Sequence, residues 1–86
     1  MAVVRVRGPL RALAGGRGEH ELEGPTVLEL LRSFESRNPD TRGWILDERG
    51  HIRPHINVFV DAERGAEHTP VPAGARVEVI PAITGG

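Results

Sequence analysis

The sequence TVLELLRSF, residues 26–34, decides the fold because it carries the clearest helix signal in the chain. Thr26 is a favourable N-cap residue, and Glu29 follows it at the spacing of a capping box. Apolar side chains recur at i, i+3, i+4 and i+7, in one stripe made of Val27, Leu30, Leu31 and Phe34. Asn38-Pro39 ends the pattern after about three turns. We therefore predict one amphipathic helix that begins at Thr26 and ends at Asn38-Pro39.

Extended segments lie on both sides of this helix. β-Branched residues, alternating polar and apolar side chains, and flanking glycines and prolines predict strands at residues 3–7, 19–22, 56–60, around 68–71 and 76–80. Residues 10–18 contain three glycines and are predicted to form a turn, and residues 40–54 a loop. Within that loop, we expect Trp44, Ile45 and Leu46 to close one end of the core.

This order of elements predicts a two-layer α+β domain. A mixed sheet of four to five strands that pairs the first strand with the last, packed on one main helix, accommodates all elements without crossing connections. That arrangement is the β-grasp, or ubiquitin-like, roll. Pro81 has no N–H to donate, so we expect strand pairing to end there. The predicted organisation is a domain at residues 1–80 and a flexible tail at residues 81–86.

The strand at residues 56–60 also predicts an exposed apolar pair. Side chains alternate between the faces of a strand, and the face expected to meet the core carries Ile56, Val58 and Val60. Phe59 then lies on the opposite face, and Ile80 of the last strand projects outward in the same way. Phe59 and Ile80 are predicted to form a docking patch that leads into the tail. The alternative is that a loop covers Phe59.

Composition excludes several classes of function. The chain has 86 residues, 11 basic against 12 acidic side chains, 3% aromatic residues and no cysteine. It therefore offers no disulfide or thiolate nucleophile, and neither the clustered positive charge nor the stacking surface that nucleic acid binding needs. No apolar run approaches the roughly 20 residues of a membrane span. We expect a small soluble cytoplasmic domain that binds neither nucleic acid nor membrane.

Catalytic and metal-binding motifs are weak. His51 and His55 are four residues apart, but Pro54 lies between them, so a helical metal site is not expected. The remaining candidates are predicted to be solvated side chains or, for the glycines, a turn: His20, His68, Asp47, Glu48, Asp61, Glu63 and Gly15–Gly18. We therefore expect no catalytic residue, no metal and no bound cofactor, and a protein that is not itself an enzyme.

The C-terminal sequence Thr84-Gly85-Gly86 is the strongest functional signal. Terminal glycines lack Cβ atoms, so their backbone can enter a channel too narrow for side chains. A six-residue tail reaches at most about 20 Å, and its last group is an ionised α-carboxylate. Such a tail can be threaded into the active site of another protein. The alternative is an end without function.

These segments together resemble the MoaD/ThiS family of ubiquitin-like sulfur carriers, in its MoaD-like and CysO-like branch. The resemblance runs almost end to end, through residues 4–7, 24–31 and 55–61 to the final segment VEVIPAITGG at residues 77–86. The family typically has Asn-Gly or Asn-Asp directly after the strand at residues 56–60, where this chain has Asp61-Ala62.

The resemblance implies a function at Gly86. An activating enzyme would use ATP to adenylate its carboxylate, and a sulfur donor would then convert it to a thiocarboxylate. Gly85, Thr84 and Ile83 would thread the channel, while Phe59, Ile80 and Pro81 would contact partners. Separately from the resemblance, Arg53 and Arg76 are candidates for steering contacts, and the alternative for both is solvated surface charge. The implied partners are the activating enzyme and a sulfur-accepting synthase of the cysteine or molybdopterin (large-subunit) type.

Two other functions remain open. A protein modifier would transfer activated Gly86 to lysine amines of target proteins, and an interaction module would use the domain and not the tail. Carriers with this ending also serve tRNA thiolation and thiamin synthesis, which we rank after cysteine and molybdopterin.

Overall fold

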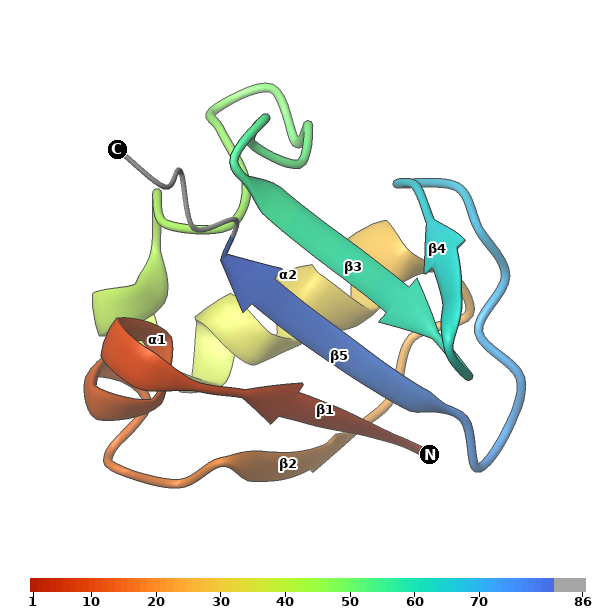
Figure 1. Ribbon diagram of the computed structural model, residues 1–86, viewed down its shortest axis with the longest axis horizontal. Helices are drawn as coiled ribbons and strands as arrows, with labels where there is room; N and C mark the ends of the chain where they lie inside the picture. The colour runs from red at the N-terminus through yellow and green to blue at the C-terminus, as the bar shows by residue number, and fades with distance from the viewer. Residues whose placement is uncertain (82–86) are drawn as a thin grey trace.

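The computed structural model describes residues 1–81 and confirms the α+β, β-grasp prediction (Figure 1). The elements in chain order are β1 (Ala2–Val6), α1 (Gly8–Leu13), β2 (Glu19–Leu22), α2 (Val27–Arg37), the 3-10 helix η1 (Pro39–Thr41), β3 (Ile56–Val60), β4 (Glu63–Gly65) and β5 (Arg76–Pro81).

The five strands form one mixed sheet in the order β2-β1-β5-β3-β4. β1 and β5 pair in parallel, as predicted for the first and last strands, and the other neighbours pair antiparallel. β5 therefore lies at the centre of the sheet. It continues through Pro81, which lies in register with Ile56, one residue beyond the predicted end of pairing. Proline lacks only the donor, and its backbone conformation fits the end of a strand.

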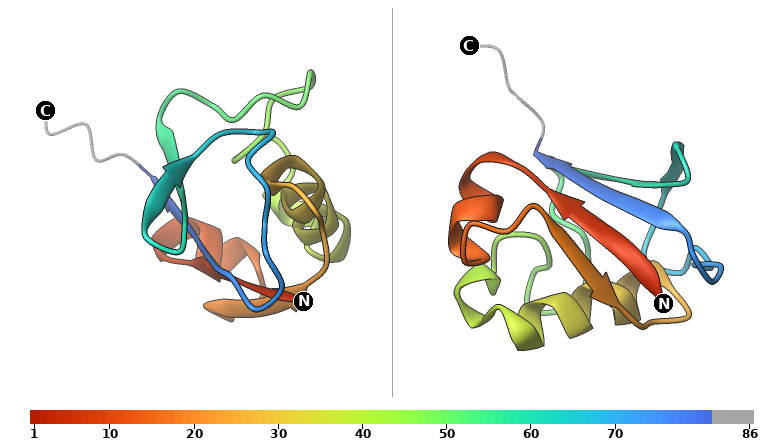
Figure 2. Two further views of the ribbon diagram at one scale, coloured as in Figure 1. Left: turned by 90° about the vertical axis from the view of Figure 1, so that its right-hand side faces the viewer. Right: turned by 90° about the horizontal axis from the view of Figure 1, so that it is seen from below.

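α2 lies across one face of the sheet, and the core fills the space between them (Figure 2). The Thr26 hydroxyl accepts a hydrogen bond from the Glu29 N–H at 3.3 Å, which confirms the predicted cap. The predicted stripe of α2 is fully buried. It packs with the inward residues of the strands and with two residues of the following loop: Val4, Val6, Leu22, Val58, Val77, Val79, Ile45 and Leu46.

Three predictions about the connections were wrong. The turn predicted at residues 10–18 was wrong in its first part, because residues 8–13 form α1. Proline is compatible with the first helical turn, and burial of Leu10 stabilises this short helix. The short fourth strand lies at Glu63–Gly65, directly after the hairpin turn, whereas Pro70 forms only an isolated bridge with Thr26. Trp44 is 46% exposed and does not close the core with Ile45 and Leu46.

No helix within residues 1–81 has the length and apolar character needed to cross a membrane.

The hairpin between β3 and β4 contains a strained alanine. Asp61 and Ala62 have φ angles of +48° and +70°, the pattern of a two-residue type I′ turn. Asp61 Oδ1 also accepts a hydrogen bond from the Arg76 N–H at 2.9 Å, which attaches the turn to β5. Alanine has no such compensation, and its Cβ makes the left-handed conformation unfavourable. Glycine would adopt this conformation freely.

We expect Ala62→Gly to raise the free energy of unfolding by about 0.5–1 kcal/mol, because relief of the left-handed strain exceeds the entropy that glycine adds to the unfolded chain. Urea unfolding followed by circular dichroism measures the change. Ala73→Gly is the matched control, since Ala73 is exposed and has a negative φ; it should lower stability. Equal destabilisation by both variants would contradict this explanation.

Candidate functional site

The site lies where the central strand of the sheet ends. Pro81, the last residue of β5, is in register with Ile56 at the start of β3, and Val79 is in register with Val6 at the end of β1. Residues 82–86 are thus attached at the centre of one end of the sheet. The predicted residues Gly86, Gly85, Thr84 and Ile83 lie outside the described residues, and their role stays a prediction.

Phe59 and Ile80 lie on the same outer face of the sheet, opposite α2. Phe59 is in register with Glu78, and Ile80 is in register with Asn57, so the two apolar side chains occupy diagonal positions on neighbouring strands. Both are half-buried, and no loop covers Phe59 completely. Pro81 follows Ile80 at the end of β5 and, by the alternation of the strand, belongs to the other face of the sheet. We call Phe59 and Ile80 the apolar pair.

Charged side chains surround the apolar pair. Arg5, Glu78, Phe59 and Arg64 lie in one row across β1, β5, β3 and β4. Arg7 lies 3.7 Å from the Glu78 carboxylate, an exposed ion pair that adds little to stability. An apolar centre with a charged rim is the usual composition of a protein–protein interface.

The two arginines predicted as steering contacts differ in environment. Arg76 is exposed, and its backbone N–H is bonded to Asp61. Arg53 is half-buried, and its Nε atom is buried without a hydrogen-bond partner among the described residues. Neither makes an ion pair within residues 1–81.

Three carboxylates with shifted pKa values accept backbone hydrogen bonds and do not form an acid–base pair. The pKa of Asp47 is lowered mainly by a hydrogen bond from the His51 N–H, and the pKa of Glu67 mainly by one from the Ile52 N–H at 2.8 Å. Glu35 shows the opposite effect, since burial raises its pKa despite a hydrogen bond from Gly43 and the nearby Arg42 and Arg32. These groups hold the loop at residues 40–54 in place.

The prediction that His20 is solvated was wrong. His20 is buried, its ring stands edge-on to Phe34 with centroids 5.0 Å apart, and Nε2 lies 2.8 Å from the Arg17 carbonyl oxygen. The sequence Glu-His-Glu-Leu contained the signal: His20 shares a face with Leu22, which is also buried. His51, His55 and His68 are exposed, as predicted. Within residues 1–81, no cluster of three or more His, Asp or Glu side chains could hold a metal ion.

The sequence matches the model of the ThiS family over residues 4–86. No match to a curated protein was found.

Several solved structures are similar over almost their whole length. A chain of the Amycolatopsis orientalis BexX/CysO complex has 30% identity, covers 100% of both chains and gives a TM-score of 0.90. Mycobacterium tuberculosis CysO has 21% identity, covers 96% of this chain and 100% of its own, and gives 0.88. Haloferax volcanii small archaeal modifier protein 1 has 23% identity, covers 95% and 97%, and gives 0.82. The last two likenesses concern the fold alone.

Acid should weaken the fold through the two hydrogen-bonded carboxylates. Their stabilisation is present above the ordinary pKa values, 3.8 for Asp47 and 4.5 for Glu67, and is lost as the pH falls through the lower values of the folded protein. Glu35 acts in the opposite direction, since its contribution is lost as the pH rises.

We expect Asp47→Asn to be less stable than the parent at neutral pH and to lose less stability on acidification, because the amide keeps the acceptor but cannot titrate. Urea unfolding at a series of pH values tests this. Glu48→Gln, which removes the neighbouring exposed carboxylate, should keep the acid dependence of the parent. The attribution to Asp47 fails if both variants show the same dependence.

Proposed function

We propose, from the premise that this chain belongs to the ThiS family of small ubiquitin-like carriers, that it carries sulfur as a thiocarboxylate on Gly86. One observation supports this most: the match to the family extends through residue 86, so it includes both terminal glycines. The position of Pro81 at the end of the central strand adds to it, since a tail attached there can reach a partner that contacts the outer face.

The proposed chemistry has two steps. A Gly86 carboxylate oxygen attacks the α-phosphorus of ATP in the active site of an activating enzyme, and pyrophosphate leaves. Hydrosulfide, or an equivalent sulfur donor at the same oxidation level, then attacks the acyl carbon, and AMP leaves with the bonding electrons of the acyl–oxygen bond. The product is a thiocarboxylate. Tethering sulfur in this way gives it a high effective concentration at the next enzyme.

The folded domain supplies the surface that partner proteins bind. The apolar pair provides contact area near the end of β5, and the charged rim provides orientation. We propose that two kinds of partner use it in turn, the activating enzyme and a sulfur-accepting synthase of the cysteine or molybdopterin type. One of the similar chains was solved in the Amycolatopsis orientalis BexX/CysO complex, which supports a role that includes binding to a partner protein. No cofactor is assigned to this chain, since ATP would be bound by the activating enzyme.

A protein modifier is the second candidate. The fold that this chain shares with small archaeal modifier protein 1 supports this second candidate. In this case a lysine ε-amine, in place of the sulfur donor, attacks the acyl carbon of the adenylate. AMP leaves, the amine loses a proton, and an isopeptide bond forms. The chain itself contains no lysine, so it cannot form side-chain-linked polymers of itself.

The test is the intact mass of the protein after incubation with the activating enzyme of its own host, ATP and sulfide. We expect a mass increase that corresponds to replacement of one oxygen by sulfur. Gly86→Ala should fold normally and remain unmodified, because its methyl group obstructs the channel. Gly18→Ala is the control: a Cβ at Gly18 makes only ordinary contacts, 3.5 Å from the Val6 carbonyl oxygen, so this variant should be charged like the parent.

Efficient charging of Gly86→Ala would contradict the steric argument. A free carboxylate as the only product would contradict the sulfur-carrier proposal. Conjugates to lysine-containing proteins without any thiocarboxylate would favour the modifier.

We also expect Phe59→Glu to slow charging by about tenfold or more at subsaturating activating enzyme, because a carboxylate replaces apolar contact area at the interface. Ala73→Glu is the control, since Ala73 is exposed in the turn before β5, at the opposite end of that strand from Pro81. Initial rates of adenylation measure both. An equal effect of the two variants would assign it to net charge instead of the apolar pair.

A further inference from the structure

β2 is an edge strand with unpaired backbone groups. Its register with β1, together with the Val6 N–H to Gly18 carbonyl bond, makes Val4–His20 and Ala2–Leu22 the hydrogen-bonded pairs. The N–H and C=O groups of Glu19 and Glu21 therefore point away from β1. Within residues 1–81 no backbone partner meets them. This edge can accept another strand.

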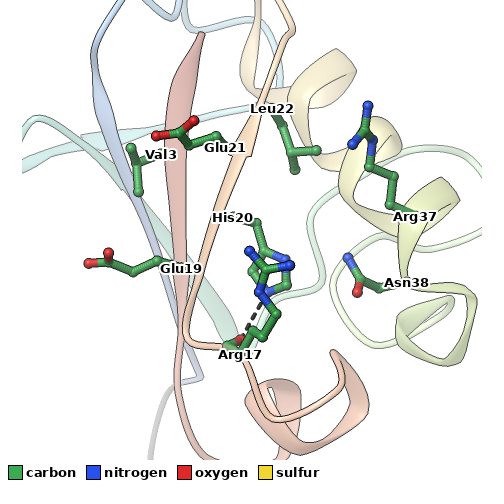
Figure 3. Close-up of a pocket in the computed structure, with 8 residues that line it drawn as sticks. All are labelled: Val3, Arg17, Glu19, His20, Glu21, Leu22, Arg37 and Asn38. Carbon is green, nitrogen blue, oxygen red and sulfur yellow. Dashed lines mark hydrogen bonds between the residues drawn. The ribbon is translucent and has the colours of Figure 1, made fainter.

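A groove runs beside this edge, between β2 and the C-terminal half of α2 (Figure 3). Arg17, His20 and Leu22 line it from the β2 side, and Arg37 and Asn38 from the α2 side. At its far end the Ser33 hydroxyl donates to the Glu23 carbonyl oxygen at 3.1 Å and joins the helix to the strand. A chain added to β2 would place every second side chain in this groove.

The two sides of the edge have opposite charge. By the alternation of the strand, Glu19 and Glu21 project to the outer face of the sheet, whereas Arg17 and Arg37 lie on the side of α2 (Figure 3). The hollow extends over the edge of β2, so its lining also includes the two glutamates. Both glutamates are exposed. Glu19 pairs with Arg5 at 3.2 Å, and Glu21, which is in register with Val3, makes no ion pair within residues 1–81. Side chains of an added strand would alternate between these two environments.

We propose that the β2 edge binds an extended segment of a partner protein whose side chains alternate between basic residues and acidic or apolar ones. The basic side chains lie beside Glu19 and Glu21, and the acidic or apolar ones enter the groove beside Arg17, Leu22 and Arg37. Main-chain hydrogen bonds to Glu19 and Glu21 supply affinity, and the alternation supplies specificity. A second copy of this chain does not fit, because antiparallel pairing of two β2 strands would bring glutamates together.

The probe is the synthetic peptide acetyl-Lys-Asp-Lys-Val-Lys-Asp-Lys-amide, titrated into the 15N-labelled full chain. We expect saturable amide shift changes at residues 17–23, 33, 37 and 38, with a Kd of about 1 mM or tighter. Amide exchange at Glu19 and Glu21 should slow. The control peptide Lys-Lys-Lys-Lys-Asp-Val-Asp, capped in the same way, has the same composition without the alternation and should bind at least about fivefold more weakly.

Four variants separate the contributions of the backbone and of the side chains. Glu21→Pro removes the outward N–H of an edge strand and should weaken binding by about tenfold, whereas Glu21→Ala keeps the N–H and should bind more tightly than Glu21→Pro. Arg37→Glu reverses one groove charge and should weaken binding by roughly fivefold. Arg64→Glu makes the same charge change on β4, at the other edge of the sheet, and should leave binding unchanged.

Equal binding of the two peptides, shift changes confined to the apolar pair, or no saturation would overturn the proposal. Shifts at residues 19–23 that depend on the concentration of the protein alone would show self-association and would also overturn it. None of these measurements depends on Gly86, so they are independent of the sulfur-carrier proposal.

Discussion

The parallel pairing of β1 with β5 is the constraint on which the rest of the structure depends. It joins the two ends of the sequence, and its facing valines, Val4 with Val77 and Val6 with Val79, are all buried. Because this pair forms the middle of the sheet, β2 and β4 are left at the edges. Because β5 is the last element of the described chain, Pro81 lies at one end of the centre of the sheet. The apolar pair and the open edge are thus separate surfaces of one sheet, and two partners can contact them independently.

Helix and strand periodicities predicted the layers of this fold because the sequence has one clear apolar stripe and two clear strands. The segments that connect these elements were harder to predict. Gly8-Pro9 ends a strand and also suits the first turn of a helix, and only the burial of Leu10 decides between the two. Residues 63–65, Glu-Arg-Gly, have no apolar alternation, and their strand exists because the turn at residues 61–62 directs the chain back along β3.

Some features of the functional surfaces could also be predicted from the sequence, and others could not. Alternation along β3 and β5 predicted the outward positions of Phe59 and Ile80 without knowledge of the third dimension. The same reasoning applied to residues 19–22 would have placed His20 inside. The groove was beyond prediction, because it requires the end of α2 to lie beside β2, and Arg17 and Arg37 are distant in sequence. The role of residues 82–86 rests on their sequence and on the family match, and it stays a prediction.

The exposure of Trp44 has an optical consequence. It is the sole indole of the chain, and tyrosine is absent, so near-ultraviolet fluorescence comes from one place on the surface. Because Trp44 is 46% exposed in the folded protein, we expect its emission to change less on unfolding than that of a fully buried indole. Its emission will instead report changes in the loop around residue 44. Fluorescence can therefore follow binding at that loop, while circular dichroism follows global unfolding of the same sample.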